Sequence, residues 1–113
     1  VETLDLTRVP DVDAALFPTG VNVEFVRLVD DAHAVMRVHE RGVGETQSCG
    51  SGACAVAAAL AVRQSVARGE WVLDVPGGRL RLALDDAGHV LLAGPAVLVA
   101  EGRWLAASTR RDS

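Results

Sequence analysis

One cysteine in this chain lies where its side chain could take up or release a proton. Cys49 is followed directly by a Gly-Ser-Gly stretch, residues 50–52, and then by an apolar run dominated by alanine. This order predicts a thiol at the N-terminus of a buried helix, a position that favours the thiolate over the thiol. The backbone N–H groups of Gly50 and Ser51 are unpaired at a helix start, so they can bind an anion such as a carboxylate.

Polar residues upstream of the cysteine could hold a substrate. Glu40 and Arg41 lie nine and eight residues before Cys49 and supply an anion and a cation. Neighbouring residues of a strand point to opposite faces, so we expect each to contact a bound molecule rather than the other. Asn22 is the only asparagine in the chain and interrupts a strand pattern, in which asparagine is disfavoured. A thiol base, an anion site and an acid–arginine pair together suit chemistry at the α-carbon of an amino acid.

Each of these residues also has a purely structural alternative. A free cysteine is most often an ordinary buried residue, and this is the role expected for Cys54, one turn into the apolar helix. The Gly-Ser-Gly stretch could serve only as a helix cap, and the Glu40–Arg41 pair could be solvated surface. Asn22 could stabilise a turn or a cap. His39 is interpreted as a strand residue rather than a general base.

Composition limits the classes of partner and cofactor. The chain has 113 residues, a net charge of −4 and 11 basic residues, all of them arginine. Basic residues do not cluster before Arg110 and Arg111, so nucleic acid is not expected as a partner. The apolar run at residues 53–62 is too short to span a bilayer, so no membrane is expected either. Without lysine the chain cannot form a Schiff base with pyridoxal phosphate, and its two cysteines lack the spacing of a zinc site. We therefore expect neither a cofactor nor a metal.

The two cysteines also indicate a cellular compartment. Cys49 and Cys54 are five residues apart near the start of one predicted helix. Their side chains would point in different directions there, so an internal disulfide is not expected. Two unbridged thiols suit a reducing compartment, and the sequence therefore predicts a cytoplasmic protein.

Hydrophobic periodicity predicts one helix and about six strands. The helix is expected over residues 53–68, ending at Gly69, and it is apolar on nearly every face, so it should be surrounded by protein. A short helical turn is expected over residues 12–16, and a loop over residues 40–52. The strands are joined mainly by hairpins and are expected at residues 21–29, 34–38, 71–75, 79–84, 90–93 and 96–100. The predicted fold is α+β, with an antiparallel sheet curled around one long buried apolar helix.

The order of these features resembles the diaminopimelate epimerase family. The most specific part is Glu-Arg-Gly-x-Gly-Glu-Thr-x-x-Cys-Gly-Ser-Gly at residues 40–52, which is similar to the second catalytic motif of that family. Residues 17–25 resemble its upstream asparagine segment. The segments that resemble its C-terminal strands are residues 75–80, 92–96 and 99–102. The resemblance covers residues 17–102 and implies one half of a fold in which two similar α/β domains face each other.

The resemblance implies a cofactor-independent amino-acid epimerase that interconverts LL- and meso-diaminopimelate. In the family, each domain contributes one cysteine. One acts as thiolate base and the other as thiol acid, so the α-proton leaves one face of the substrate and returns on the other. The matching catalytic residue here is Cys49. The matching substrate-binding residues are Gly50 and Ser51, as N–H donors to the carboxylate, together with Asn22, Glu40 and Arg41.

The resemblance leaves the first domain of the family unmatched. It implies that residues 1–95 are part of a C-terminal catalytic domain, that residues 96–105 form a terminal strand packing on the missing first domain, and that residues 106–113 are a tail. The chain alone is then expected to be inactive and to associate, either with itself or with the missing domain or a complementary fragment. One alternative is a proline racemase-like enzyme of the same fold, against which the Glu-Arg-Gly-x-Gly-Glu-Thr sequence argues. The other is a non-catalytic α+β module kept for binding or assembly.

Overall fold

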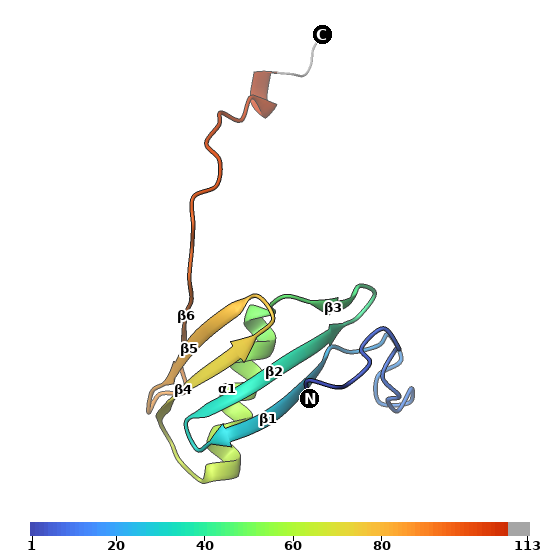
Figure 1. The fold of residues 1–113 in the computed structure, drawn as a ribbon, viewed down its shortest axis with the longest axis vertical. Coiled ribbons are helices and arrows are strands. Elements are labelled where there is room, and N and C mark those ends of the chain that lie inside the picture. The colour runs from blue at the N-terminus through green and yellow to red at the C-terminus, as the bar shows by residue number, and fades with distance from the viewer. Residues whose placement is uncertain (109–113) are drawn as a thin grey trace.

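Among residues 1–108, which the computed structural model describes, six strands form one sheet that packs against one α-helix. The elements in chain order are β1 (Val23–Asp30), β2 (His33–Glu40), β3 (Gly44–Thr46), α1 (Gly50–Gln64), β4 (Gly69–Val75), β5 (Gly78–Leu84), β6 (Val90–Ala93) and a short 3-10 helix, Ala106–Ser108. Figure 1 shows α1 against the sheet and a long C-terminal segment that points away from both. The predicted α+β class is confirmed.

The sheet is mixed, not wholly antiparallel as predicted. Its strand order is β1-β2-β4-β5-β6, and β3 pairs with β2. The hairpins β1–β2, β4–β5 and β5–β6 are antiparallel, but β2 and β4 run parallel, with Ala34 opposite Leu73. The prediction is wrong at this pair because α1 lies between β2 and β4 in the chain. A helical crossover returns the next strand in the same direction.

The core lies between the sheet and α1. Alternate residues of β2 and β4 face the helix because successive side chains of a strand point to opposite faces, and they include Met36, Trp71 and Leu73. Helix α1 contributes mainly alanines, together with Val56 and Leu60. The Trp71 indole N–H donates to the side-chain oxygen of the last helical residue, at 3.2 Å. This bond satisfies the one polar atom of the largest core side chain.

Helix α1 begins and ends earlier than predicted. It starts at Gly50, with Cys49 as its N-cap residue. It ends before Ser65, which has φ 58° and ψ 43° and whose N–H donates back to carbonyls of the last turn. This left-handed residue stops the helix, so the expected stop at Gly69 is wrong. Gly69 opens β4 instead, where a Cβ would lie 2.8 Å from the Trp71 ring.

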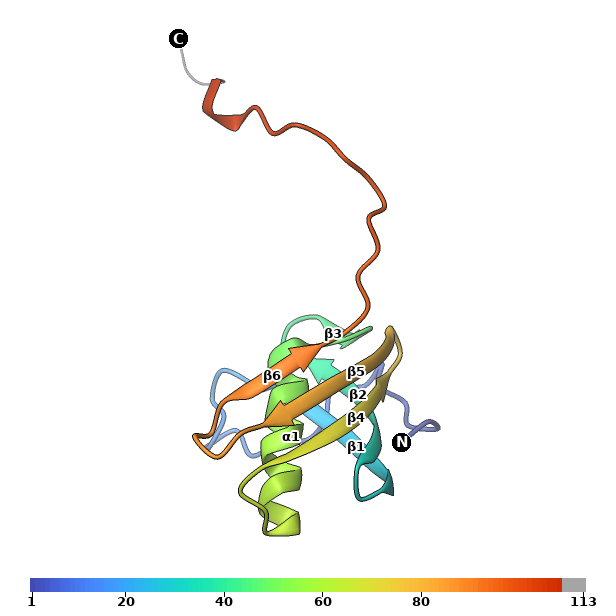
Figure 2. The same cartoon turned by 90° about the vertical axis from the view of Figure 1, so that its left-hand side faces the viewer.

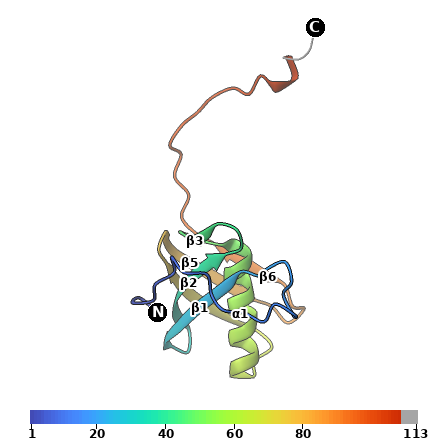
Figure 3. The same cartoon turned by 90° about the vertical axis from the view of Figure 1, so that its right-hand side faces the viewer.

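One face of α1 is not covered by protein within residues 1–108. Its residues follow a helical spacing; Val62 is 80 % exposed, and the others are Ala55, Ala58 and Ala59. Figure 2 shows strands in front of the helix, and Figure 3, from the opposite side, shows the helix with the N-terminal segment running across it. The prediction of a long helix surrounded by protein is therefore not confirmed. Helix α1 has 15 residues, and the sheet covers it on one side.

The segments outside the sheet differ at the two ends of the chain. Residues 1–22 form no helix or strand. Asp13 O accepts hydrogen bonds from the N–H groups of Leu16 and Phe17, at 3.1 and 2.9 Å, which confirms the turn predicted there. Leu6 is buried, so this segment is packed onto the domain.

Residues 94–105 form no strand in this structure, although a strand was predicted over residues 96–100. The segment projects from the sheet (Figure 1), and the molecule measures 60 Å along its longest axis against 33 and 29 Å across. Leu98 is 98 % exposed. An extended segment becomes a strand only where a sheet edge lies beside it, so its packing on a first domain stays a prediction. Residues 109–113 of the predicted tail lie outside the described residues.

Candidate active site

Cys49 lies at the point where the loop after β3 becomes α1. Its backbone is extended, with φ −138° and ψ 108°, and its carbonyl accepts the first helical hydrogen bond, from Ala53 N–H at 2.8 Å. Its Sγ lies 3.6 Å from Ser51 Oγ, and the residue is only 9 % exposed. Cys54 lies within the helix, half-buried against the core, and both thiols are free. Cys49 therefore sits at the helix N-terminus, as predicted.

The first turn of α1 combines small side chains with N–H groups that the helix itself cannot pair. Gly50 and Ser51 are exposed, and no residue of this turn is acidic. Gly52 leaves room for a carboxylate from β1, because a Cβ at this position would lie 2.7 Å from Glu24 Oε1. Glu24 thus lies beside the positive end of the helix dipole, which favours a negative charge. The sequence analysis missed Glu24, although an acidic residue at an inward position of a strand is a signal for it.

Glu40 ends β2 on the face of the sheet that carries the helix. Met36 of the same strand is buried in the core with α1, and Val38 is buried as well. Glu40 follows them at the same two-residue spacing. Thr46 Oγ1 donates a short hydrogen bond to the Glu40 carboxylate. The carboxylate is therefore held beside β3, on the side of the sheet where α1 lies. Thr46 is a second residue that the sequence analysis missed.

Arg41 is held through its backbone, and its side chain is exposed. Its N–H donates to Asn22 Oδ1 at 2.8 Å. Gly20 passes close by with φ +82°, and a Cβ there would lie 3.1 Å from Arg41 Cγ. Within residues 1–108 the Arg41 guanidinium forms no ion pair, so it is not paired with Glu40. The structure brings Asn22 and Arg41 together and gives Asn22 the turn-stabilising role that the sequence left open.

His39 lies on the other face of β2. It is buried and lines a cavity of about 120 Å³ together with Arg41. The other residues of the cavity come from the N-terminal segment, the start of β1 and the turn after β2, and they are Val9, Pro10, Val12, Gly20, Val21, Val23 and Gly42. This position agrees with the interpretation of His39 as a strand residue and places its side chain opposite that of Glu40.

Two turns hold the loop that leads to Cys49. Gly42 and Gly44 have φ of +77° and +101°, values that favour glycine, and they reverse the chain from β2 to β3. Gly77, in the turn between β4 and β5, donates its N–H to Gln47 O at 2.8 Å. A Cβ on Gly77 would lie 3.1 Å from that oxygen, a tight contact that glycine avoids. The predicted hairpin turn therefore also fixes the chain two residues before the cysteine.

The residues that the structure describes contain no group of three or more His, Cys, Asp and Glu side chains placed to hold a metal ion. Within residues 1–108 no helix combines the length and the apolar character needed to cross a membrane.

Comparison with known proteins identifies relatives of the whole chain. A family model described as diaminopimelate epimerase matches residues 5–99. The chain is similar to the diaminopimelate epimerase of Acidothermus cellulolyticus, with 52 % identity over 119 residues that cover 99 % of this chain and 39 % of the relative. For the enzyme of Rhodococcus opacus the identity is 47 %, over 90 % of this chain and 35 % of the relative. For the enzyme of Xanthomonas euvesicatoria pv. vesicatoria the identity is 53 %, over 80 % of this chain and 32 % of the relative.

The chain thus spans between about a third and two-fifths of the length of these curated relatives. The matched region includes every strand, the helix, and the loop that carries Glu40, Arg41 and Cys49. With that motif at the start of α1 and a family match over residues 5–99, this chain belongs to the diaminopimelate epimerase family.

Proposed function

We propose that this chain is the C-terminal catalytic part of a diaminopimelate epimerase and supplies one of two thiols that interconvert LL- and meso-diaminopimelate. The observation that carries the proposal is Cys49 at the N-terminus of α1, inside the motif at residues 40–52. Relatives that are 47–53 % identical and are named diaminopimelate epimerase support the reaction class. In this proposal the enzyme is an isomerase of lysine biosynthesis and uses neither pyridoxal phosphate nor a metal.

In the proposed reaction the α-carbon of the substrate lies between two cysteines. The thiolate of one removes the α-proton, and the thiol of the other donates a proton to the opposite face, so the configuration inverts. Cys49 serves as base in one direction and as acid in the reverse direction. Cys54 is a poor candidate for the second thiol, since it lies within α1 and packs against the core. We assign the second thiol to a part of the enzyme that these 113 residues do not contain.

The other site residues hold the charged groups around the reacting carbon. The N–H groups of Gly50 and Ser51 donate to the α-carboxylate, which gains negative charge as the α-proton leaves. Glu40 accepts from the α-ammonium group, and Arg41 pairs with a carboxylate of the substrate. Asn22 keeps Arg41 in place through its backbone and contacts the substrate beside it. The Asn22–Arg41 contact and the exposed Arg41 side chain support these roles.

The rest of the catalytic unit covers the apolar surfaces that this chain exposes. We propose that residues 1–95 form part of the C-terminal domain and that residues 96–105 become a strand on the first domain. The exposed face of α1 and the exposed apolar residues 97–99 support this, because apolar surface of this extent marks an interface. The greater length of the relatives supports it as well. The chain alone is then inactive, because it supplies only one base.

Isotope exchange tests the proposal. The full product of the gene is incubated with LL-diaminopimelate in deuterated water, and deuterium at the α-carbon and formation of the meso isomer are followed together. We expect exchange with inversion in the wild type and a loss of about 10³-fold or more in Cys49→Ala, because a positioned acid–base group is removed. Cys49→Ser should retain at most a trace, since a hydroxyl is a far weaker acid than a thiol.

Cys54→Ala is the matched control and should turn over at close to the wild-type rate. Near-normal turnover of Cys49→Ala would remove that cysteine from the mechanism. A wild-type protein without exchange, even after addition of the first part of the A. cellulolyticus relative, would contradict the proposal and favour a non-catalytic assembly module.

A further inference from the structure

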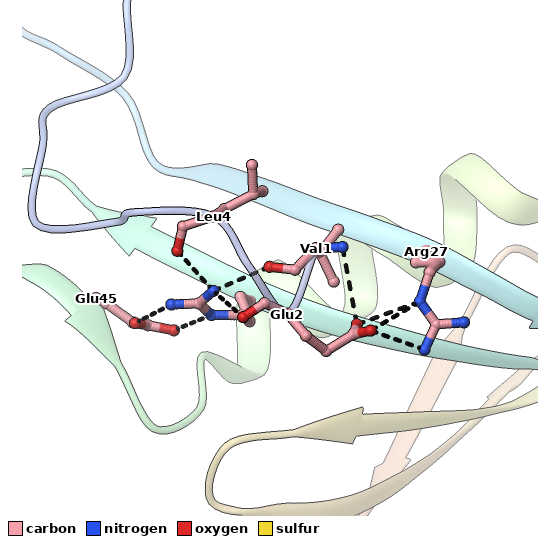
Figure 4. A network of polar contacts seen from close by, with 6 residues as sticks. Val1, Glu2, Leu4, Arg27 and Glu45 are labelled. Atoms are coloured by element: carbon pink, nitrogen blue, oxygen red, sulfur yellow. Dashed lines mark hydrogen bonds and ion pairs between the residues drawn. The ribbon is translucent and has the colours of Figure 1, made fainter.

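The Arg37 guanidinium joins three parts of the chain on the outer face of the sheet. Its Nε and Nη2 donate to the two carboxylate oxygens of Glu45, each at 2.7 Å. Its Nη1 donates to the backbone carbonyls of Val1 and Leu4, at 2.9 and 2.8 Å. Figure 4 shows these partners from the N-terminal segment and from β3 around one guanidinium. Arg37 thus ties the N-terminal segment and β3 to the middle of β2.

This ion pair is less exposed than its neighbour. The side chains of Arg37 and Glu45 are 18 % and 28 % exposed, whereas those of the adjacent Arg27–Glu2 pair are 46 % and 55 % exposed. Water screens a less exposed pair less, and a two-pronged contact holds both groups in one orientation. The hydrogen bonds from Arg37 and its charge lower the pKa of Glu45, and Glu45 in turn raises the pKa of Arg37. The pair is therefore stronger than an ordinary surface contact.

Strand β3 needs such an anchor because its own pairing is short. It has three residues, and it pairs only with the end of β2, where Thr46 lies opposite Val38 and Glu45 opposite His39. A strand this short at the edge of a sheet opens easily when backbone bonds alone hold it. The Glu45 side chain adds a contact on the outer face, two residues along β2 from its backbone partner.

The inner face of β3 contacts the candidate active site through Thr46. Successive side chains of a strand point to opposite faces, so Thr46 faces inward where Glu45 faces outward. Thr46 Oγ1 donates to the Glu40 carboxylate. Cys49 is held by different contacts, the helical bond to Ala53 and the bond from Gly77 to Gln47. Thr46 Oγ1 also lies 3.4 Å from Ser48 O, a longer contact next to the cysteine. The outer ion pair therefore acts mainly on Glu40.

We propose that Arg37 and Glu45 are positioning residues that hold β3, and through Thr46 the Glu40 carboxylate, in the geometry that binds the substrate ammonium group. The proposal rests on the proposed function for the role of Glu40, but the anchoring of β3 is measurable without any activity. It names two residues on the face of the sheet opposite the site, at which no substrate contact occurs.

Hydrogen–deuterium exchange and steady-state kinetics on the full gene product test this. In Glu45→Gln and in Arg37→Lys, amide exchange over residues 43–48 should rise about tenfold, while α1 amides stay within about twofold. KM for diaminopimelate should rise about tenfold with kcat within about threefold, because substrate binding is disturbed and the thiol is not. Glu70→Gln is the matched control, since Glu70 is exposed on β4 and its side chain forms no hydrogen bond or ion pair within residues 1–108, and it should change neither quantity.

A third variant tests the hydrogen bond from Thr46 to Glu40 separately from the anchoring of β3. Thr46→Val keeps the shape of the side chain and removes the hydroxyl, so KM should rise while exchange over residues 43–48 stays near wild type. Unchanged exchange in both Glu45→Gln and Arg37→Lys would overturn the anchoring. A fall in kcat at constant KM would also overturn the proposal, because it reports fewer folded molecules rather than a displaced Glu40. If the two variants show raised exchange but the wild-type protein has no epimerase activity, the proposed function is contradicted and only the anchoring of β3 is supported.

Discussion

Glu24 reaches the first turn of α1 beside Gly52, where a Cβ would lie 2.7 Å from Glu24 Oε1. A Gly-Ser-Gly stretch can therefore serve two purposes in one place. Gly50 and Ser51 leave N–H groups open for an anion, and Gly52 admits a carboxylate from a strand 28 residues earlier in the chain. At the scale of single residues, the site therefore depends on the small size of these residues as well as on the thiol.

Asp74 is the residue whose ionisation the structure perturbs most clearly. The Arg79 guanidinium, with Nε 2.7 Å from Oδ1, and the His33 imidazole, with Nε2 2.6 Å from Oδ2, lower the pKa of Asp74 to about 2 from 3.8. A carboxylate with a lowered pKa stabilises the fold above its unfolded pKa and loses that effect as pH falls toward its folded pKa. We therefore expect the contribution of Asp74 to fade between pH 3.8 and about 2.

Urea unfolding of the wild type and Asp74→Asn at several pH values measures this contribution. We expect Asp74→Asn to lower the free energy of unfolding by about 1 kcal/mol at neutral pH, a discounted value because a third of the side chain is exposed and water screens the pairs. The difference should shrink as the pH is lowered through the stated range. Asp11→Asn, at an exposed position, is the control and should show no such trend. A difference that stays constant with pH would show that charge is not the cause.

Ser65 shows how one residue sets the length of an element. Its φ of 58° lies in the left-handed region, and it is the only non-glycine residue with positive φ among residues 1–108. This conformation is about 1–2 kcal/mol less favourable for an L-residue with a side chain, whereas glycine adopts it without that cost. The helix therefore ends here against the intrinsic preference of serine, because the chain must turn back to bring Trp71 into the core.

Ser65→Gly should stabilise the protein by about 0.5–1 kcal/mol, since relief of strain exceeds the added flexibility of the unfolded chain. The free energy of unfolding in urea is the measurement. Ser48→Gly is the matched control, because Ser48 has no positive φ, and it should leave the stability unchanged or lower it. Equal effects of the two substitutions would argue that Ser65 carries no strain.

At the scale of the whole molecule, two of the apolar surfaces that the described residues leave uncovered favour association. One is the face of α1 that includes Val62, and the other is the segment at residues 97–99. Water-exposed apolar surface favours association with any complementary apolar partner. We therefore expect the 113-residue chain, taken by itself, to associate in a concentration-dependent way.

Val62→Glu should weaken this association about tenfold or more, because an unpaired charge is costly to bury. Sedimentation velocity at several concentrations is the measurement. Val43→Glu is the matched control, since Val43 is a similarly exposed valine in the turn between β2 and β3, away from α1. If both variants associate as the wild type does, the face of α1 is not the contact surface.

Local patterns in the sequence predict part of the local structure. The strand at residues 90–93 is found with the predicted bounds, and the other strands of the sheet differ from prediction at their ends, apart from the unpredicted β3. Cys49 at a helix start and the turn near Asp13 follow from residue order alone. Glu40 was expected in a loop and instead ends β2. These features depend on neighbours within a few residues, so short-range propensity and spacing determine them.

Long-range packing decided the rest. The parallel pairing of β2 with β4, the early end of α1 at Ser65 and the uncovered face of that helix all depend on which surfaces bury each other. The contacts of Glu24 with the helix start and of Arg37 with Glu45 join residues whose meeting requires the folded sheet. A sequence pattern states which faces are apolar, but only the tertiary structure selects their partners, because that choice minimises the exposed apolar area of the whole molecule.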